Sequence, residues 1–205
     1  MKVLAVCGLR REMRLVPGAV TPKDIAAAAD VAGIISIGIA GALAPDLNIG
    51  DTVIAERVVT ASEAFETDAK WTARLAAALR DAHLGTILGR DVIAGSVEVK
   101  ALLHESSRAD AVDMESHLAA RAARARGVPF AALRVISDGA ERALPPAALV
   151  AMRPDGSIAL GRVLGSVLRS PGQIAALIRT GRDSAAAFAV LKHNLEMLGP
   201  DLRLL

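Results

Sequence analysis

The sequence predicts an α/β domain with a largely parallel central sheet, and three observations favour this class. Short apolar runs alternate with Ala-rich or amphipathic segments along the 205 residues. These runs are apolar at consecutive positions, which is typical of strands buried on both faces of a parallel sheet. The chain is also long enough to enclose one substantial core. We therefore expect a single domain over residues 1–205.

The first part of the chain predicts two strands with a helix between them. Residues 3–7 are a short apolar run closed by Gly8, which predicts a buried strand. Residues 24–31 are rich in Ala and favour a helix. A second buried strand is expected over residues 33–37, and it should end in a glycine turn at residues 38–41.

Turn residues separate the elements in the middle of the chain. Residues 45–50 contain Pro, Asp, Asn and Gly, so we expect a loop there. Residues 52–60 alternate enough to form a strand. Either Asp68 or Thr72 is suited to cap a helix that runs to about His83.

The alternation continues to residue 136. We expect strands at residues 86–93 and 109–112, with a helix at residues 97–105 between them. A further helix at residues 115–126 ends before a glycine, and residues 128–136 form the last expected strand.

The remainder of the chain, from Leu144 on, is expected to be mostly helical. Its longest helix should span about residues 173–198, where apolar side chains recur at helical spacing. The favoured interpretation is a helix packed on the sheet. A surface helix that meets lipid or a partner subunit is the alternative.

The composition excludes several function classes. The formal net charge is +2 and no Lys/Arg block is interleaved with aromatic residues, so no nucleic-acid partner is expected. Cys7 is the single cysteine, which excludes an internal disulfide and favours a reducing compartment. No apolar run is long enough for a signal peptide or a membrane span. We expect a cytoplasmic protein, with peripheral contact at the inner membrane surface left open.

Metals and cofactors are not expected. The sequence has no CxxC or HExxH spacing for a metal and no complete GxGxxG pattern for a dinucleotide. Cys7 lies in an apolar run without a neighbouring His, which favours an inert buried thiol. His117 fits a core or helix-surface position as well as one that reaches a site.

Three acidic residues closely follow predicted strands. They are Glu12, Glu115 and Asp138. Ligands of parallel sheets bind beyond the carboxyl ends of the strands, so these positions suit a shared site. A loop carboxylate is more often solvated or a helix cap, and the spacing alone leaves both interpretations open.

Three motifs occur in order at residues 38–51 (GIAGAL, PD and IGD), 112–115 (VDME) and 128–138 (VPF to ISD). In this order they resemble the motifs of the purine nucleoside phosphorylase and methylthioadenosine/S-adenosylhomocysteine nucleosidase superfamily. The resemblance implies a nucleoside-phosphorylase-like three-layer domain, with a central mixed sheet flanked by helices. It also implies a homodimer.

The resemblance implies a role for each carboxylate in cleaving a purine N-glycosidic bond. Asp138 would protonate N7 of the leaving adenine, with Ser137 orienting it. Glu115 would accept hydrogen bonds from the ribose hydroxyls, with Met114 packed under the sugar. Glu12 would act as the base that activates the incoming water.

The same resemblance implies further substrate-binding residues. The glycines at positions 8, 38 and 41, with Ala40 beside Gly41, should let the backbone approach the ligand. Val97 is a candidate for the wall of the purine pocket. Phe65 is a candidate for the 5′ side of the sugar, in its own subunit or a neighbouring one, and ordinary packing is the equal alternative.

Three further segments narrow the resemblance to the hopanoid-associated branch. They are residues 94–96, 111–117 and 142–149. The implied substrate is adenosylhopane, a lipid-linked nucleoside whose 5′ carbon carries a triterpenoid. Release of adenine would leave a ribosyl hopane for hopanoid biosynthesis.

The nucleophile is left open between water and phosphate, with water favoured. Phosphorylases of this superfamily place an Arg and a Ser where this chain has Ser36 and Ile39, which removes a charge-assisted contact to an oxyanion. Arg10 and Arg11 fit either phosphate binding or a solvated pair. Phosphorolysis is therefore one alternative, and a non-catalytic nucleoside-binding module is another.

The segment between Gly8 and Gly38 departs from the superfamily. It is shorter by roughly two strands, more than ordinary loop variation explains. We expect a sheet with fewer strands than usual, and the placement of Glu12 depends most on this segment.

Overall fold

The structure is a computed structural model that describes residues 2–151, 159–199 and 202. Its strands are β1 (Lys2–Val6), β2 (Val31–Ala42), β3 (Thr52–Val59), β4 (Ala64–Glu66), β5 (His83–Gly89), β6 (Ala111–Asp113) and β7 (Phe130–Asp138). Its helices are α1 (Arg10–Met13), α2 (Ala69–Ala78), α3 (Val97–Ser107), α4 (Ser116–Arg126), α5 (Pro146–Leu149), α6 (Leu160–Arg169) and α7 (Ile174–Leu198), with 3₁₀ helices η1 (Pro22–Ala27) and η2 (Pro171–Gln173).

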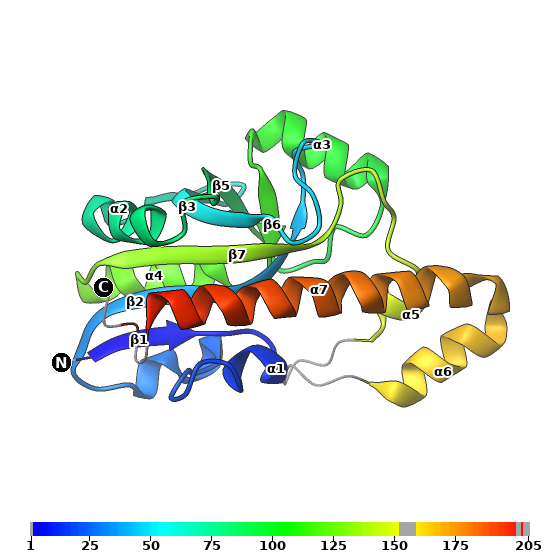
Figure 1. Cartoon of the computed structure of the whole chain (residues 1–205), viewed down its shortest axis with the longest axis horizontal. Helices are drawn as coiled ribbons and strands as arrows, with labels where there is room; N and C mark the ends of the chain where they lie inside the picture. Colours follow the sequence, from blue (N-terminus) through cyan, green and yellow to red (C-terminus); the bar gives the residue numbers. More distant parts are fainter. Residues whose placement is uncertain (1, 152–158, 200–201, 203–205) are drawn as a thin grey trace.

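The strands of the described residues form one mixed sheet, which confirms the predicted α/β class (Figure 1). β1 pairs with β2, β2 with β7, β3 with β5 and β5 with β6 in parallel. β2 pairs with β6, β3 with β4 and β3 with β7 in antiparallel fashion. Because β2, β7, β3, β5 and β6 pair in turn and β6 pairs again with β2, these five strands close into a ring.

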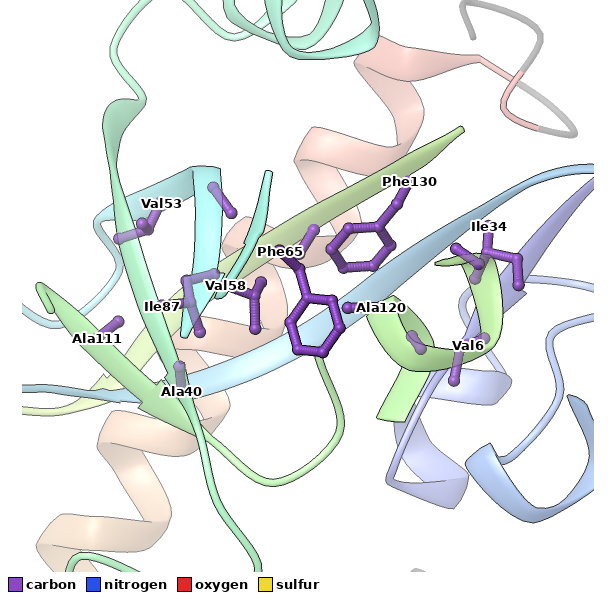
Figure 2. Close-up of a cluster of buried hydrophobic side chains, with 14 of the residues drawn as sticks. Val6, Ile34, Ala40, Val53, Val58, Phe65, Ile87, Ala111, Ala120 and Phe130 are labelled. Atoms are coloured by element: carbon purple, nitrogen blue, oxygen red, sulfur yellow. The ribbon is translucent and has the colours of Figure 1, made fainter. Parts of the chain in front are cut away.

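Helices cover the sheet on two sides. α4 and η1 contribute Ala119, Ala120, Ala123 and Ile25 to one hydrophobic cluster, which Figure 2 shows around Phe65 and Phe130. α2 and α7 contribute Trp71, Leu75, Phe188 and Leu191 to the other. Figure 1 shows α7 running alongside β7, with which it packs closely. The small Ala side chains let α4 approach the strands closely, and burial of the apolar surface on both sides stabilises the layers.

Two expected elements near the N-terminus were wrong. Residues 24–31 do not form an α-helix, because the 3₁₀ helix η1 ends at Ala27 and β2 begins at Val31. Asp30 has a φ of 52°, a left-handed conformation that turns the chain into the strand. The expected glycine turn at residues 38–41 is also absent, since β2 continues through these glycines to Ala42.

The parallel partner explains why β2 continues through its glycines. β7 runs beside β2 over eight register pairs, from Ile34 opposite Phe130 to Gly41 opposite Asp138, with one irregularity between Ala40 and Gly41. The ladder hydrogen bonds hold the glycines extended although they lack side chains to pack. Acidic side chains occupy the space beside them.

The next helix and strand are displaced from their expected positions. α2 is capped by Asp68, whose Oδ1 accepts hydrogen bonds from Lys70 N and Trp71 N at 3.0 Å each. It ends at Ala78 rather than near His83, which instead opens β5. β5 therefore covers His83–Gly89 rather than residues 86–93, because pairing with β3 starts at His83.

The C-terminal helices match the expected helical region, of which residues 152–158 lie outside the described part. The C-terminal half of α7 buries Ala187, Phe188 and Leu191 against the sheet, as predicted. Its N-terminal half exposes Ile174 and Ile178. Packing on the sheet is therefore confirmed for the C-terminal half, and contact of the helix with lipid or a partner subunit stays a prediction. Among the described residues, none of the helices has the length and hydropathy that crossing a membrane requires.

The short segment between Gly8 and Gly38 connects β1 to its neighbour β2 in the sheet. It contains α1, η1 and the first part of β2, and β1 pairs with β2 in parallel. α1 follows β1 immediately and carries Glu12 toward β2.

Candidate active site

A cleft of about 210 Å³ lies between the ends of β2 and β7, the turn before α4, and α5 and α7. Seven of the nine predicted site residues line it, namely Glu12, Ala40, Gly41, Met114, Glu115, Ser137 and Asp138. A larger cavity of about 970 Å³ lies between β1, residues 14–18 and the end of α7, and none of the three carboxylates lines it. The smaller cleft is therefore the candidate active site.

The strand directions explain how distant carboxylates reach one cleft. Glu12 follows the end of β1, and Asp138 ends β7, which runs parallel to β1 through β2. Glu115 arrives differently, because β6 pairs antiparallel with the end of β2, with Val112 opposite Gly41. The chain after β6 therefore runs back along β2. Glu12 and Asp138 thus follow the carboxyl ends of parallel strands, where ligands of such sheets bind, whereas Glu115 follows a strand that is antiparallel to β2.

Three glycines make room for the three carboxylates. A Cβ added at Gly8 would lie 2.2 Å from Glu115 Oε1, and one at Gly38 would lie 2.4 Å from Glu12 Oε1. A Cβ at Gly41 would lie 2.8 Å from Asp138 Oδ2. We expected these glycines to let the backbone approach a ligand, and this stays a prediction. Their immediate neighbours in the structure are the acidic side chains.

Glu12 is buried and held by backbone donors. Its Oε2 accepts hydrogen bonds from Gly8 N at 3.0 Å and Leu9 N at 2.8 Å, and its Oε1 accepts one from Ile39 N at 2.9 Å. Burial raises the pKa of Glu12 above its ordinary value, although Arg134 and these donors act in the opposite direction. A carboxylate in this setting is a stronger base than one in water.

Glu115 lies beside other charged groups under the cleft. Burial, together with the nearby Asp113 and Glu12, raises the pKa of Glu115 to about 8, although Arg134 acts in the opposite direction. The folded protein therefore holds Glu115 largely protonated at neutral pH.

The cation between these acids is Arg134, which is fully buried in β7. Its Nε donates to Asp113 Oδ2 at 2.5 Å and its Nη2 donates to Ser36 Oγ at 2.7 Å. Burial by itself would lower the pKa of Arg134, but Asp113, Glu115 and Glu12 hold it above its ordinary value. One permanent cation thus faces three acids, of which Glu12 and Glu115 have a raised pKa, mainly because both are buried.

Asp138 has a buried basic partner that the sequence analysis missed. Lys100 Nζ donates to Asp138 Oδ2 at 2.5 Å, and Ser137 Oγ donates to Asp138 Oδ1 at 3.1 Å. The Ser137 hydroxyl also lies 3.2 Å from Ala40 O. The expected pairing of Ser137 with Asp138 is therefore present in the geometry.

The hydrophobic pattern gave no signal for Lys100. α3 buries this lysine completely while it exposes Val99 and Leu102, the reverse of an ordinary amphipathic helix. Asp113 and Arg134 were inside the quoted motifs but had no assigned role. Their pairing depends on β6 and β7 lying across β2, which no local spacing reveals.

Two predicted binding residues do not line the cleft in this chain. Phe65 is buried in the hydrophobic core, and Arg124 lies over its ring with the guanidinium carbon 4.4 Å from the ring centroid. Val97 is the first residue of α3, and the neighbouring wall is formed by Val92, Ile93 and Ala94. A contribution of Phe65 to a neighbouring subunit stays a prediction.

Two other residues, Cys7 and His117, take the structural positions that the sequence allowed. Cys7 is buried, and burial raises the pKa of its thiol far above its ordinary value, which makes it a poor nucleophile. His117 is buried, with Nε2 3.3 Å from Asp91 Oδ1, and it does not line the cleft.

The positions that would bind phosphate are occupied by other contacts. Ser36 is buried under Arg134, and Ile39 offers its backbone N–H to Glu12. Arg11 stacks on Phe188 at 4.2 Å from the ring centroid, and neither Arg10 nor Arg11 lines the cleft.

Comparison with known proteins agrees with this architecture. The family model described as the phosphorylase superfamily matches residues 2–169. The S-adenosylhomocysteine nucleosidase of Streptococcus pyogenes is 19% identical over 89% of this chain and 96% of its own, with a TM-score of 0.61. The 5′-methylthioadenosine/S-adenosylhomocysteine nucleosidase of Helicobacter pylori is 18% identical over 96% of this chain and 98% of its own, with a TM-score of 0.61. Futalosine hydrolase of Helicobacter pylori is 17% identical over 94% of this chain and 97% of its own, with a TM-score of 0.59. At these identities the solved structures show a shared fold.

Proposed function

The chain belongs to the phosphorylase superfamily, and from this membership and the cleft we propose that it hydrolyses the N-glycosidic bond of a 5′-substituted adenosine. The observation that carries the proposal is the meeting of Glu12, Glu115 and Asp138 in one cleft. When such a bond breaks, positive charge develops on the sugar and the nucleobase is a poor leaving group. The proposed reaction therefore needs an acid, a negative group near the sugar and a base.

Asp138 serves the nucleobase in this proposal. Protonation of adenine at N7 makes it a better leaving group, and a carboxyl group held beside the base delivers that proton. Ser137 orients the carboxyl group through its hydrogen bond to Oδ1. Ile93 and Ala94 offer apolar surface for the purine ring.

Glu115 binds the sugar in this proposal. Two ribose hydroxyls donate to one ionised carboxylate, which fixes the ring and places negative charge near the developing cation. Because the pKa of Glu115 is about 8 in the folded protein, binding of the sugar at pH 7 must release a proton from it. Met114 lies in the same wall and packs against the sugar.

Glu12 activates water in this proposal. Its raised pKa makes it a better proton acceptor than an exposed carboxylate, and three backbone donors fix its orientation. The contacts of Ser36 and Ile39 support water over phosphate, because neither residue offers a free cation or hydroxyl to an oxyanion.

The proposed substrate is adenosylhopane or a related nucleoside with an apolar 5′ group. A cleft of about 210 Å³ suits the nucleoside part, so the triterpenoid must extend out of it. Leu144 and Ala148 line the cleft on the side of α5 and provide an apolar exit. Loss of adenine would then leave a ribosyl hopane.

Assembly and location are part of the same proposal. We take residues 1–205 as one domain that acts in the cytoplasm as a homodimer. Peripheral membrane contact is supported by α6, which exposes Leu160, Leu164 and Leu168 in one row at a spacing of four residues. Light scattering tests the dimer, and flotation with vesicles tests the membrane contact.

The decisive experiment compares adenosylhopane with methylthioadenosine, each with and without phosphate, and measures free adenine. The proposal expects adenine without phosphate and a preference for adenosylhopane. Phosphate dependence with a ribose 1-phosphate product would establish phosphorolysis. Nucleoside binding without free adenine after long incubation would establish a non-catalytic module.

A further inference from the structure

Lys100 is a fully buried lysine whose ammonium group has three oxygen partners. Nζ lies 2.5 Å from Asp138 Oδ2, 2.7 Å from Gly139 O and 3.2 Å from Arg142 O. These acceptors account for the three N–H bonds of an ammonium group. The side chain therefore occupies its site in the charged form, and the proposed acid Asp138 is its counter-ion.

The burial of Lys100 makes its ion pair with Asp138 important for the stability of the charged side chain. A lysine that is 0% exposed needs its partners, because an unpaired buried ammonium group is strongly unfavourable. A helix on the surface of the domain would bury Leu or Ala at this position at much lower cost. The resting ion pair also leaves Asp138 as a carboxylate, which has no proton of its own to deliver.

We propose that Lys100 is a positioning residue that fixes Asp138 against the nucleobase and supplies the proton that Asp138 passes to it. The inference rests on the proposed function and deepens it. The proton has a direct route, since Nζ donates to Oδ2 of the same carboxyl group that faces the cleft.

The proton and electron balance is complete without a further reactant. An Nζ–H bond of Lys100 breaks as an O–H bond forms on Asp138, and Asp138 gives a proton to N7 of adenine. The glycosidic electron pair leaves with the base. Water adds its oxygen to the anomeric carbon and its proton to Glu12. Proton exchange with solvent then returns Lys100 and Glu12 to their starting forms.

A double-mutant cycle tests whether Lys100 acts through Asp138. K100M should lower kcat by at least about 50-fold while KM changes less than about 3-fold. D138N should lower kcat similarly. K100M/D138N should lie within about 3-fold of D138N, because a residue that acts only through Asp138 has nothing left to act on. Multiplying effects in the double variant would overturn the proposal.

The pH profile separates proton supply from a structural role of the lysine. In the wild type, kcat should fall on the alkaline side, and K100M should lack this limb. An alkaline limb that persists unchanged in K100M would overturn the proposal. So would a K100M enzyme within 3-fold of wild type, which would mean that Asp138 takes up its own proton once its counter-ion is removed.

K100R provides the second variant if K100M does not fold. Arg keeps the positive charge but does not release its proton in proteins. Folded K100R should therefore keep substrate binding and lose kcat at least about 50-fold. Full kcat in K100R would refute proton supply. A wild type that releases no adenine from any nucleoside would reject the proposed function, whereas an active wild type with unaffected Lys100 variants would reject this inference alone.

Discussion

Replacing Glu115 with Gln should make the protein more stable at neutral pH while it weakens catalysis. The pKa of Glu115 is about 8 in the folded chain, against an ordinary value of 4.5. Between these two values the folded state keeps the proton and the unfolded state releases it. The stability contributed by Glu115 is therefore fully present below pH 4.5 and declines until about pH 8.

The magnitude follows from the same pKa values. At pH 7 the carboxyl group of the unfolded chain is ionised, because the pH lies well above its pKa of 4.5. Each pH unit above that pKa corresponds to about 1.4 kcal/mol of stability lost, as long as the folded state keeps its proton. The free energy of unfolding of the wild type is then lowered by about 3 kcal/mol relative to a neutral side chain. Gln carries no titrating proton, so E115Q avoids this loss.

Urea unfolding of both proteins at several pH values between 4 and 9 measures the effect. The stability difference, E115Q minus wild type, should be near zero at pH 4, rise to about 3 kcal/mol at pH 7 and level off above pH 8. E141Q is the matched control, because it makes the same substitution at the exposed Glu141. A difference that is flat or falls with pH would refute the account of Glu115.

Three further predictions concern the site and the core. D138N should keep the fold by circular dichroism but lower kcat about 10²–10⁴-fold, because an amide does not act as an acid; comparable turnover would remove Asp138 from the mechanism. Gly38→Ala places a Cβ 2.4 Å from Glu12 Oε1 and should displace that side chain and lower kcat, whereas Gly161→Ala, with nothing within 4 Å, should behave as wild type in the same assay. Phe65→Leu should lower the free energy of unfolding by about 1 kcal/mol and leave KM unchanged, and a raised KM in a properly folded variant would instead assign Phe65 to a substrate site.

The alternation of apolar runs with Ala-rich segments was enough to predict the class of the fold. The strand β4 was not predicted from the sequence. It has only three residues, Ala64–Glu66, and only its pairing with β3 makes it a strand. Helix ends were predicted well where a local group stops the helix. Gly127 ends α4 with a φ of 63°, and Asp68 caps α2.

Elements whose form depends on distant partners were predicted poorly. Glycines at positions 38–41 read locally as a turn, yet the ladder with β7 keeps them extended. The Ala-rich residues 24–31 read locally as a helix, yet β2 takes over at Val31 because it pairs with β1. Local propensity contributes less free energy than a complete set of ladder hydrogen bonds with buried side chains.

The sequence alone determined the α/β class and the three acidic positions at which a site was expected. Only the tertiary structure decided that Glu12, Glu115 and Asp138 line one cleft and that Lys100 is buried against Asp138. The physical reason is that charge and burial are properties of the surroundings. A carboxyl group acquires its pKa from the cations, donors and apolar atoms around it, and those neighbours come from strands and helices far away in the chain.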